Sequence, residues 1–258
     1  MEHNRDLATY IDSWAAHRPE APAIEFEGQS DTYLQLSNNI ETVANGLYDL
    51  GVRPTDRVAW LGHNRPLAIE MLLACSRLGA IYLPLNSRLT VAEHQWILND
   101  ATPTVLVADK DFLEQANAAL ITSELEVRVE AELHAASPSA PRIGAANDDV
   151  LLAYTSGTTG RPKGAVLTQK ALLANAVNAT HAHDFSSHDR VLTLLPLFHV
   201  GGLNIQTLPA LFAGAAVLLH KSFNPEIWLK DVQRWKPTWS LLVPATLNAV
   251  SKHPNFKD

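Results

Sequence analysis

The segment YTSGTTGRPKG, residues 154 to 164, gathers the residue types that hold phosphate groups. It contains three glycines, four serine or threonine hydroxyls and two cationic side chains. Glycines let a backbone come close to a ligand, and backbone N–H groups and hydroxyls donate hydrogen bonds to phosphate oxygens. Lys163 adds a positive point charge. A strand over 150–154 and a helix over 169–182 flank the segment, so we expect a strand–loop–helix arrangement that cradles phosphate.

The best-known nucleotide motifs do not describe this loop. The P-loop pattern GxxxxGK[ST] fails because Gly164 follows Lys163 and Pro162 stands where a glycine is needed. The dinucleotide fingerprint GxGxxG does not occur in the sequence. The failed pattern counts against a P-loop NTPase, and ATP hydrolysis without any further substrate would favour that alternative.

Helical and strand patterns alternate on both sides of the loop. Helical spacing of apolar residues, with glycine or capping signals at the ends, predicts helices over 32–50, 66–78, 90–100, 169–182, 203–212 and 225–235. Short apolar runs predict strands over 57–62, 80–86, 104–109, 150–154, 191–198, 215–220 and 238–244. Residues 122–149 are expected to form an irregular connection. This alternation favours an α/β fold with a largely parallel sheet covered by helices.

Composition excludes several other classes. The 258 residues carry a formal net charge of −7 and no cluster of basic residues, so nothing indicates binding to nucleic acid. The N-terminus is too polar for a signal peptide, and the apolar stretch 200–219 is interrupted by polar residues, so we expect no membrane span. Cys75, the single cysteine, cannot form an internal disulfide, which fits the cytoplasm, and we expect it to be a buried core residue.

YTSGTTGRPKG resembles the phosphate loop of the adenylate-forming (AMP-binding) superfamily, and the likeness continues outside it. GVRPTDRVAWLGHN (51–64), RLGAIYLPLNSRLTVAEHQWILNDATPTVLVAD (77–109) and LPLFHVGGLN (195–204) are similar to other segments of the acyl-CoA synthetase branch. The resemblance covers about residues 7 to 256. It implies two helix-flanked, largely parallel sheets interleaved in sequence, the first from residues 52–182 and the second, incomplete, from 1–51 plus 183–258.

The resemblance also implies a reaction. A carboxylic acid, fatty or aryl, is activated with ATP to an acyl-adenylate and then transferred to CoA as a thioester, with Mg²⁺ accompanying ATP. The loop then supplies the contacts to the ATP phosphates: Thr155, Ser156, Gly157, Thr158, Thr159, Gly160 and Lys163. By the same resemblance, the Thr155 hydroxyl corresponds to a group that can meet Mg²⁺.

The resemblance places His199, Gly201 and Gly202 at the acyl-binding site, where His199 orients the carboxylate and the glycines leave room for the acyl chain. A histidine satisfied within the core is the alternative. Relatives that activate amino acids carry an aspartate at the position of His199, so its absence favours a simple carboxylic acid. Many relatives have a histidine where this chain has Gln169, at a helix start that we expect to tolerate change.

Segments that the family needs later in its chain are not in these residues. They are a G-G-A-P turn, Y-G-x-T-E, T-G-D and a C-terminal domain with its catalytic lysine. We therefore assign no catalytic residue here, expect this N-terminal piece to be inactive alone, and expect its unfinished sheet to favour self-association. A non-catalytic nucleotide-binding or scaffold protein is the alternative.

Overall fold

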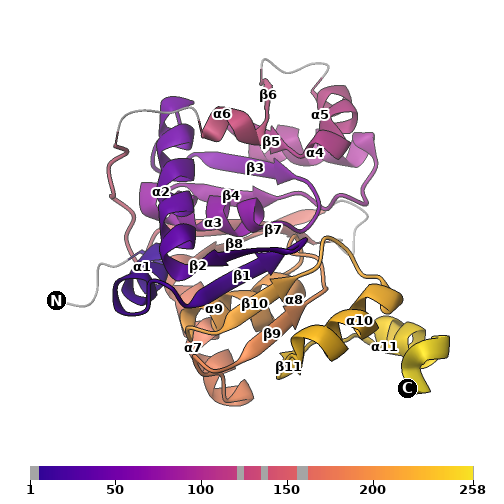
Figure 1. The fold of residues 1–258 in the computed structure, drawn as a ribbon. Helices are drawn as coiled ribbons and strands as arrows, with labels where there is room; N and C mark the ends of the chain where they lie inside the picture. The colour runs from indigo at the N-terminus through magenta and orange to yellow at the C-terminus, as the bar shows by residue number, and fades with distance from the viewer. Residues whose placement is uncertain (1–5, 121–124, 135–138, 156–161, 258) are drawn as a thin grey trace.

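The computed structural model describes residues 6–120, 125–134, 139–155 and 162–257, and these form two β-sheets, one above the other in Figure 1. Sheet A has the strand order β11–β9–β10–β1–β2. Its strands are β1 (Pro22–Phe26), β2 (Gln29–Thr32), β9 (Arg190–Thr193), β10 (Ala216–Leu219) and β11 (Trp239–Ser240). Sheet B has the order β6–β5–β3–β4–β7–β8. Its strands are β3 (Arg57–Leu61), β4 (Ile81–Pro84), β5 (Val105–Ala108), β6 (Val127–Arg128), β7 (Asp149–Thr155) and β8 (Lys163–Thr168).

All neighbouring strands within the two sheets run parallel except two edge strands. β2 is antiparallel to β1, and β8 is antiparallel to β7. The α-helices are α1 (Ala8–His17), α2 (Tyr33–Asp49), α3 (Pro66–Leu78), α4 (Val91–Ala101), α5 (Leu113–Ala119), α6 (Glu130–Leu133), α7 (Gln169–His183), α8 (Val200–Gly202), α9 (Leu208–Phe212), α10 (Pro225–Trp235) and α11 (Pro244–Ser251). Shorter helical turns are η1 (Lys110–Phe112), the π-helical η2 (Leu203–Thr207) and η3 (Pro254–Lys257).

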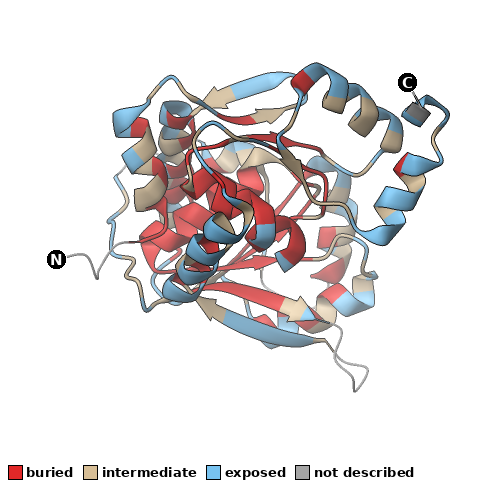
Figure 2. Cartoon of the chain, turned by 90° about the horizontal axis from the view of Figure 1, so that it is seen from below, coloured by how far each residue is buried: buried red, intermediate tan, exposed pale blue. Residues whose placement is uncertain are grey.

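Side chains that alternate along the strands divide the core into layers. Val58 and Trp60 of β3 belong to a cluster shared with sheet A, α2 and α3, whereas Ala59 and Leu61 face α4 and α5 on the other side. Leu218 of β10 lies with α10 on the outer face of sheet A. Residues 67–78 of α3 are all buried, and the buried residues gather in the middle of the molecule in Figure 2. Burial on both faces explains why these strands are short continuous apolar runs.

The α/β class with two interleaved, mostly parallel sheets is confirmed. Sheet A takes strands from 22–32 and 190–240, and sheet B takes all of its strands from 57–168. The chain thus leaves sheet A, builds sheet B and returns. The limits at residues 52 and 182, taken as boundaries of separate regions, stay a prediction.

Several local predictions need correction. A strand, β8, and not a helix, follows the phosphate loop, so the strand–loop–helix arrangement is wrong. The expected strand over 191–198 ends at Thr193, and the one over 238–244 has only two residues. The expected irregular segment contains β6 and α6, and the expected helix over 203–212 begins with a π-helical turn.

Candidate active site

Among the described residues, a large cavity lies where the strands of both sheets end. It has a volume of about 710 Å³. Its walls come from the loops that follow parallel strands: 62–64 after β3, 86–88 after β4, 194–199 after β9 and 221–223 after β10. Ligands of open α/β sheets bind outside the carboxyl ends of the strands. Position and lining therefore make this cavity the first candidate for a substrate.

A second cavity of about 360 Å³ adjoins the phosphate loop. Thr155 and Pro162, which stand on the two sides of that loop, both line it, together with residues 84–86 at the end of β4 and residues of α4. Asn86, Phe198 and His199 line both cavities. The two hollows thus share a wall, which contains His199.

The described residues next to the phosphate loop form the end of a hairpin. Thr155 and Lys163 are paired across β7 and β8. Both are exposed, so their side chains are accessible to a ligand. The predicted contacts Ser156, Gly157, Thr158, Thr159 and Gly160 lie outside the described residues and remain predictions.

Tyr154 fixes the strand that enters the loop, and sequence reasoning missed this role. Its hydroxyl donates to Asp100 Oδ2 of α4 at 2.6 Å, and its ring meets the Trp96 ring edge-on at 6.0 Å. Burial and the Asp100 carboxylate raise the pKa of Tyr154, so the phenol stays protonated as a donor. Gly164 lies opposite, where an added Cβ would come within 3.2 Å of the tyrosine ring. These contacts hold the hairpin against α4.

His199 is exposed, which is contrary to a histidine satisfied within the core. It caps the short helix α8, and its Nδ1 accepts a hydrogen bond from the Gly201 N–H at 3.0 Å. With Nδ1 as acceptor, the neutral ring carries its proton on Nε2. The side chain can therefore present one N–H donor at the wall between the cavities.

The two glycines after His199 have a local structural reason. An added Cβ at Gly202 would lie 2.3 Å from the Pro196 carbonyl oxygen, and one at Gly201 would lie 3.1 Å from His199 Nδ1. The space beside Gly202 is therefore filled by backbone and is not the room expected for an acyl chain. Gly202 still lines the larger cavity, so a role of both glycines in acyl binding stays a prediction.

Cationic side chains stand at the larger cavity, and the sequence motifs gave no signal for them. Lys221 Nζ binds Asp111 Oδ2 at 2.9 Å, and that carboxylate raises the pKa of Lys221. The Arg88 guanidinium lies 5.9 Å above the ring of Phe198. His63 packs edge-on against Phe112 at 4.8 Å. The lining thus combines apolar walls with positive charge, which suits an organic anion.

The described residues do not by themselves fit a Mg²⁺ ion. Thr155 offers one hydroxyl, and Glu93 is the carboxylate in the same cavity. Glu93 already accepts hydrogen bonds from the Thr90 N–H and hydroxyl, and the bond from the Thr90 N–H lowers its pKa. Mg²⁺ prefers carboxylates and phosphates in octahedral geometry. Among the described residues, no group of three or more His, Cys, Asp or Glu side chains could hold a metal, including around His181 and His183.

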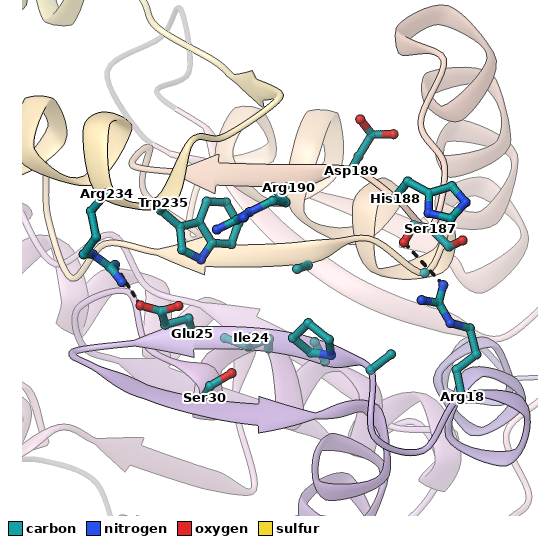
Figure 3. Close-up of a pocket in the computed structure, with 15 residues that line it drawn as sticks. Arg18, Ile24, Glu25, Ser30, Ser187, His188, Asp189, Arg190, Arg234 and Trp235 are labelled. Carbon is teal, nitrogen blue, oxygen red and sulfur yellow. Dashed lines mark hydrogen bonds and ion pairs between the residues drawn. The ribbon is translucent and has the colours of Figure 1, made fainter.

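A further hollow of about 590 Å³ lies away from the motifs (Figure 3). Arg190 and Ala216 line it, and they are the first residues of β9 and β10, so it lies toward the amino ends of these strands. Arg234 pairs with Glu25 at 2.7 Å, and Arg190 covers the ring of Trp235 at 4.5 Å. Its arginines thus have partners within the fold, and we assign it no chemistry.

These features agree with one family. The family model described as AMP-binding enzyme matches residues 11–258, and the chain belongs to this family. The chain is 40% identical to the indoleacetate–CoA ligase of Aromatoleum aromaticum, covering 98% of this chain and 52% of that protein. It is 42% identical to a feruloyl-CoA synthase of Amycolatopsis, covering 96% and 51%. The chain thus spans about half the length of these curated relatives.

Solved structures show the same architecture. The crystal structure of ATP-bound MatB from Rhodopseudomonas palustris superposes with a TM-score of 0.84 at 28% identity, covering 97% of this chain and 52% of that one. No described helix of the present chain has both the length and the apolar character required to cross a membrane. Cys75 is buried, as expected, and burial raises the pKa of its thiol.

Proposed function

We propose that this chain is part of a ligase that activates a carboxylic acid with ATP and transfers the acyl group to CoA. The observation that carries the proposal is the wall between the two cavities. His199 lies on this wall, with the ends of the phosphate loop on one side and the large cavity on the other. An acid in the large cavity can thereby meet the α-phosphate of ATP held at the loop.

The residues have distinct tasks in this reaction. The loop and Lys163 neutralise the β- and γ-phosphates, and the His199 Nε2–H orients the carboxylate. A carboxylate oxygen forms a bond to the α-phosphorus, while the bond from that phosphorus to pyrophosphate breaks. In the second step the CoA sulfur bonds to the acyl carbon, AMP leaves, and the thiol proton passes to solvent. Positioning and charge neutralisation therefore account for most of what this chain supplies.

The acid is proposed to be apolar and without an α-ammonium group. Leu194, Leu195, Phe198 and Phe223 line the larger cavity, and the described lining contains no carboxylate that could pair with an ammonium. Two curated relatives are named for indoleacetate and for feruloyl-CoA, which favours an aryl acid over a fatty acid. A role in fatty acid metabolism remains the second option.

The proposal also covers the metal ion, the location of the protein and the behaviour of the isolated chain. Mg²⁺ would accompany ATP and be held mainly by phosphate oxygens, with the Thr155 hydroxyl as one ligand. We place the protein in the cytoplasm, give it no nucleic-acid partner, and expect the isolated chain to self-associate. We also expect no adenylate formation by the 258-residue chain alone. Carboxylate-dependent exchange of pyrophosphate into ATP by this chain would refute that last expectation.

The first test is ATP binding by the isolated chain, followed by NMR. The backbone amide signals of Thr155 and Lys163 should shift on addition of ATP. Lys163→Ala should weaken binding by about tenfold or more, because it removes a charge-assisted contact to phosphate. Lys170→Ala, which removes an exposed cation on α7, is the matched control. No ATP-dependent shift at either amide would count against the proposal.

A further inference from the structure

The two halves of the proposed site belong to different sheets. The phosphate loop joins β7 and β8 of sheet B, whereas His199 follows β9 of sheet A. Their separation is therefore set by contacts between the sheets. Such contacts must be precise, because catalytic groups lose effect when displaced by about 1 Å.

One side chain in the wall of the larger cavity crosses between the sheets. Asn64 follows β3 of sheet B and is 5% exposed. Its Nδ2 donates to the Leu195 carbonyl at 3.0 Å and to the His220 carbonyl at 3.1 Å. Its Oδ1 accepts from the Leu197 N–H at 2.8 Å. All three partners are backbone groups of sheet A or of the loops that follow its strands.

The backbone around Asn64 is itself anchored on both sides. The Asn64 N–H donates to the Lys221 carbonyl at 3.3 Å, after β10. The next residue, Arg65, pairs with Asp109 at 3.0 Å and with Glu130 at 2.6 Å, both on the side of sheet B. Asn64 thus lies on a segment tied to sheet B and holds the loop that leads to His199.

The contacts explain why an asparagine suits this position. Two donors and one acceptor face two carbonyls and one N–H, so the amide has a single favourable orientation. An aspartate would turn an oxygen toward both carbonyls, and an alanine would leave three buried backbone groups without this partner. Sequence motifs could not reveal this role, since Asn64 and Leu197 are 133 residues apart.

We infer that Asn64 is a positioning residue: its three side-chain hydrogen bonds fix the 195–199 loop, and with it His199, relative to Thr155 and Lys163 at the two ends of the phosphate loop. The inference rests on the proposed function, because it concerns the geometry between ATP and the group that orients the acid. It predicts that the response of His199 to ATP bound at the loop weakens when the side-chain hydrogen bonds of Asn64 are removed.

The test uses the labelled 258-residue chain, with ATP as the probe. In the wild type, ATP should shift the amide signals of Thr155 and Lys163 and also the ring signals of His199. Asn64→Ala should keep the shifts at the loop and lose at least half of the shift at His199. The same variant should speed hydrogen exchange of the Leu197 amide by about tenfold or more, because its acceptor is gone.

Two further variants keep the result interpretable. Asn64→Asp retains an acceptor for the Leu197 N–H but loses both donors, so Leu197 should stay protected while the His199 response falls. If Asn64→Ala does not fold, Asn64→Asp tests whether Asn64 positions His199. Asn45→Ala is the control, because Asn45 also bonds a distant backbone group, the Ala140 N–H at 2.7 Å, but lies away from both cavities. Asn45→Ala should change neither the ATP-induced shift of the His199 ring signals nor the hydrogen-exchange rate of the Leu197 amide.

The possible failures can be told apart. If ATP shifts neither the Thr155 nor the Lys163 amide signal in the wild type, the proposed function is refuted. Loop signals that respond while His199 does not, or a His199 response that survives in both Asn64 variants, would overturn the inference about Asn64.

Discussion

Glu70 is a buried carboxyl group whose ionisation should control the stability of the chain. It lies in α3, is 4% exposed, and accepts a hydrogen bond from Asn39 Nδ2 at 3.1 Å. Burial raises its pKa from 4.5 to about 7, and the carboxylates of Asp31 and Glu130 add repulsion. Arg65 opposes these effects only weakly. The folded protein therefore favours the neutral acid.

The sign and size of the effect follow from linkage. Below the unfolded-state pKa the carboxyl is neutral in both states and costs nothing. As the pH rises from 4.5 to about 7, the unfolded chain ionises this carboxyl while the folded chain keeps it protonated, so stability falls, and the loss is complete once the pH has passed the folded-state pKa of about 7. A rise from 4.5 to about 7, at about 1.4 kcal/mol per pH unit, corresponds to about 3 kcal/mol. Most of this should appear between about pH 5 and about pH 8.

The assay is urea unfolding of Glu70→Gln and wild type at both pH values. The free energy of unfolding of the variant should rise by about 2–3 kcal/mol relative to that of the wild type as the pH rises from about 5 to about 8. Glu41→Gln on α2, an exposed position, is the control and should show a nearly constant difference. A Glu70→Gln difference that does not change with pH would refute the reasoning.

Two other predictions concern positions that the motifs left uncertain. Gln169→Ala should lower the free energy of unfolding by about 2–4 kcal/mol, since Gln169 is 1% exposed and exchanges hydrogen bonds with the Ser76 hydroxyl and carbonyl. Lys170→Ala, on the exposed neighbour, should change it by less than about 0.5 kcal/mol; equal effects in urea unfolding would contradict the account. Gly202→Ala should displace the loop before α8, because its Cβ would meet the Pro196 carbonyl oxygen, and an unchanged NMR spectrum around that loop would disprove this.

Helix ends were the most predictable part of the fold because their signals are local. Thr90 and Glu93 form a capping box on α4, a local capping signal of the kind used to predict that helix, with the Glu93 side chain accepting from the Thr90 N–H at 2.8 Å. Gly79 ends α3 with a positive φ of 68°. Both devices depend on residues within four positions of each other.

Short strands at the sheet edges were missed for physical reasons. β8 (KGAVLT) has only three consecutive apolar residues, with Lys163 and Gly164 before them, and most of its side chains are exposed, so its pattern is weaker than that of the central strands. The β1–β2 hairpin carried one sequence signal, Gly28, at the second position of a two-residue turn in which Glu27 and Gly28 both have positive φ. The strands beside that turn are only five and four residues long, too short for a clear periodic pattern.

Residues of the candidate site could be predicted only where they lie together in one continuous sequence motif. His199 lines both cavities, and its contact with the carboxylate stays a prediction. The roles of Asn64, Arg88 and Lys221 depend on loops that converge from distant parts of the sequence. Tolerance of change at Gln169 was a poor expectation for the same reason, because its partners are Ser76 and Leu7. Convergence of this kind is a property of the tertiary structure.

The central claim is that the loop and His199 serve carboxylate activation. Its most direct test is acid-dependent exchange of pyrophosphate into ATP by a chimera of residues 1–258 with the C-terminal half of the Amycolatopsis feruloyl-CoA synthase. The account predicts exchange only when a carboxylic acid is present, strongest with aryl acids and lost in Lys163→Ala. ATP hydrolysis without an acid, and no exchange with any acid by the folded chimera, would contradict it.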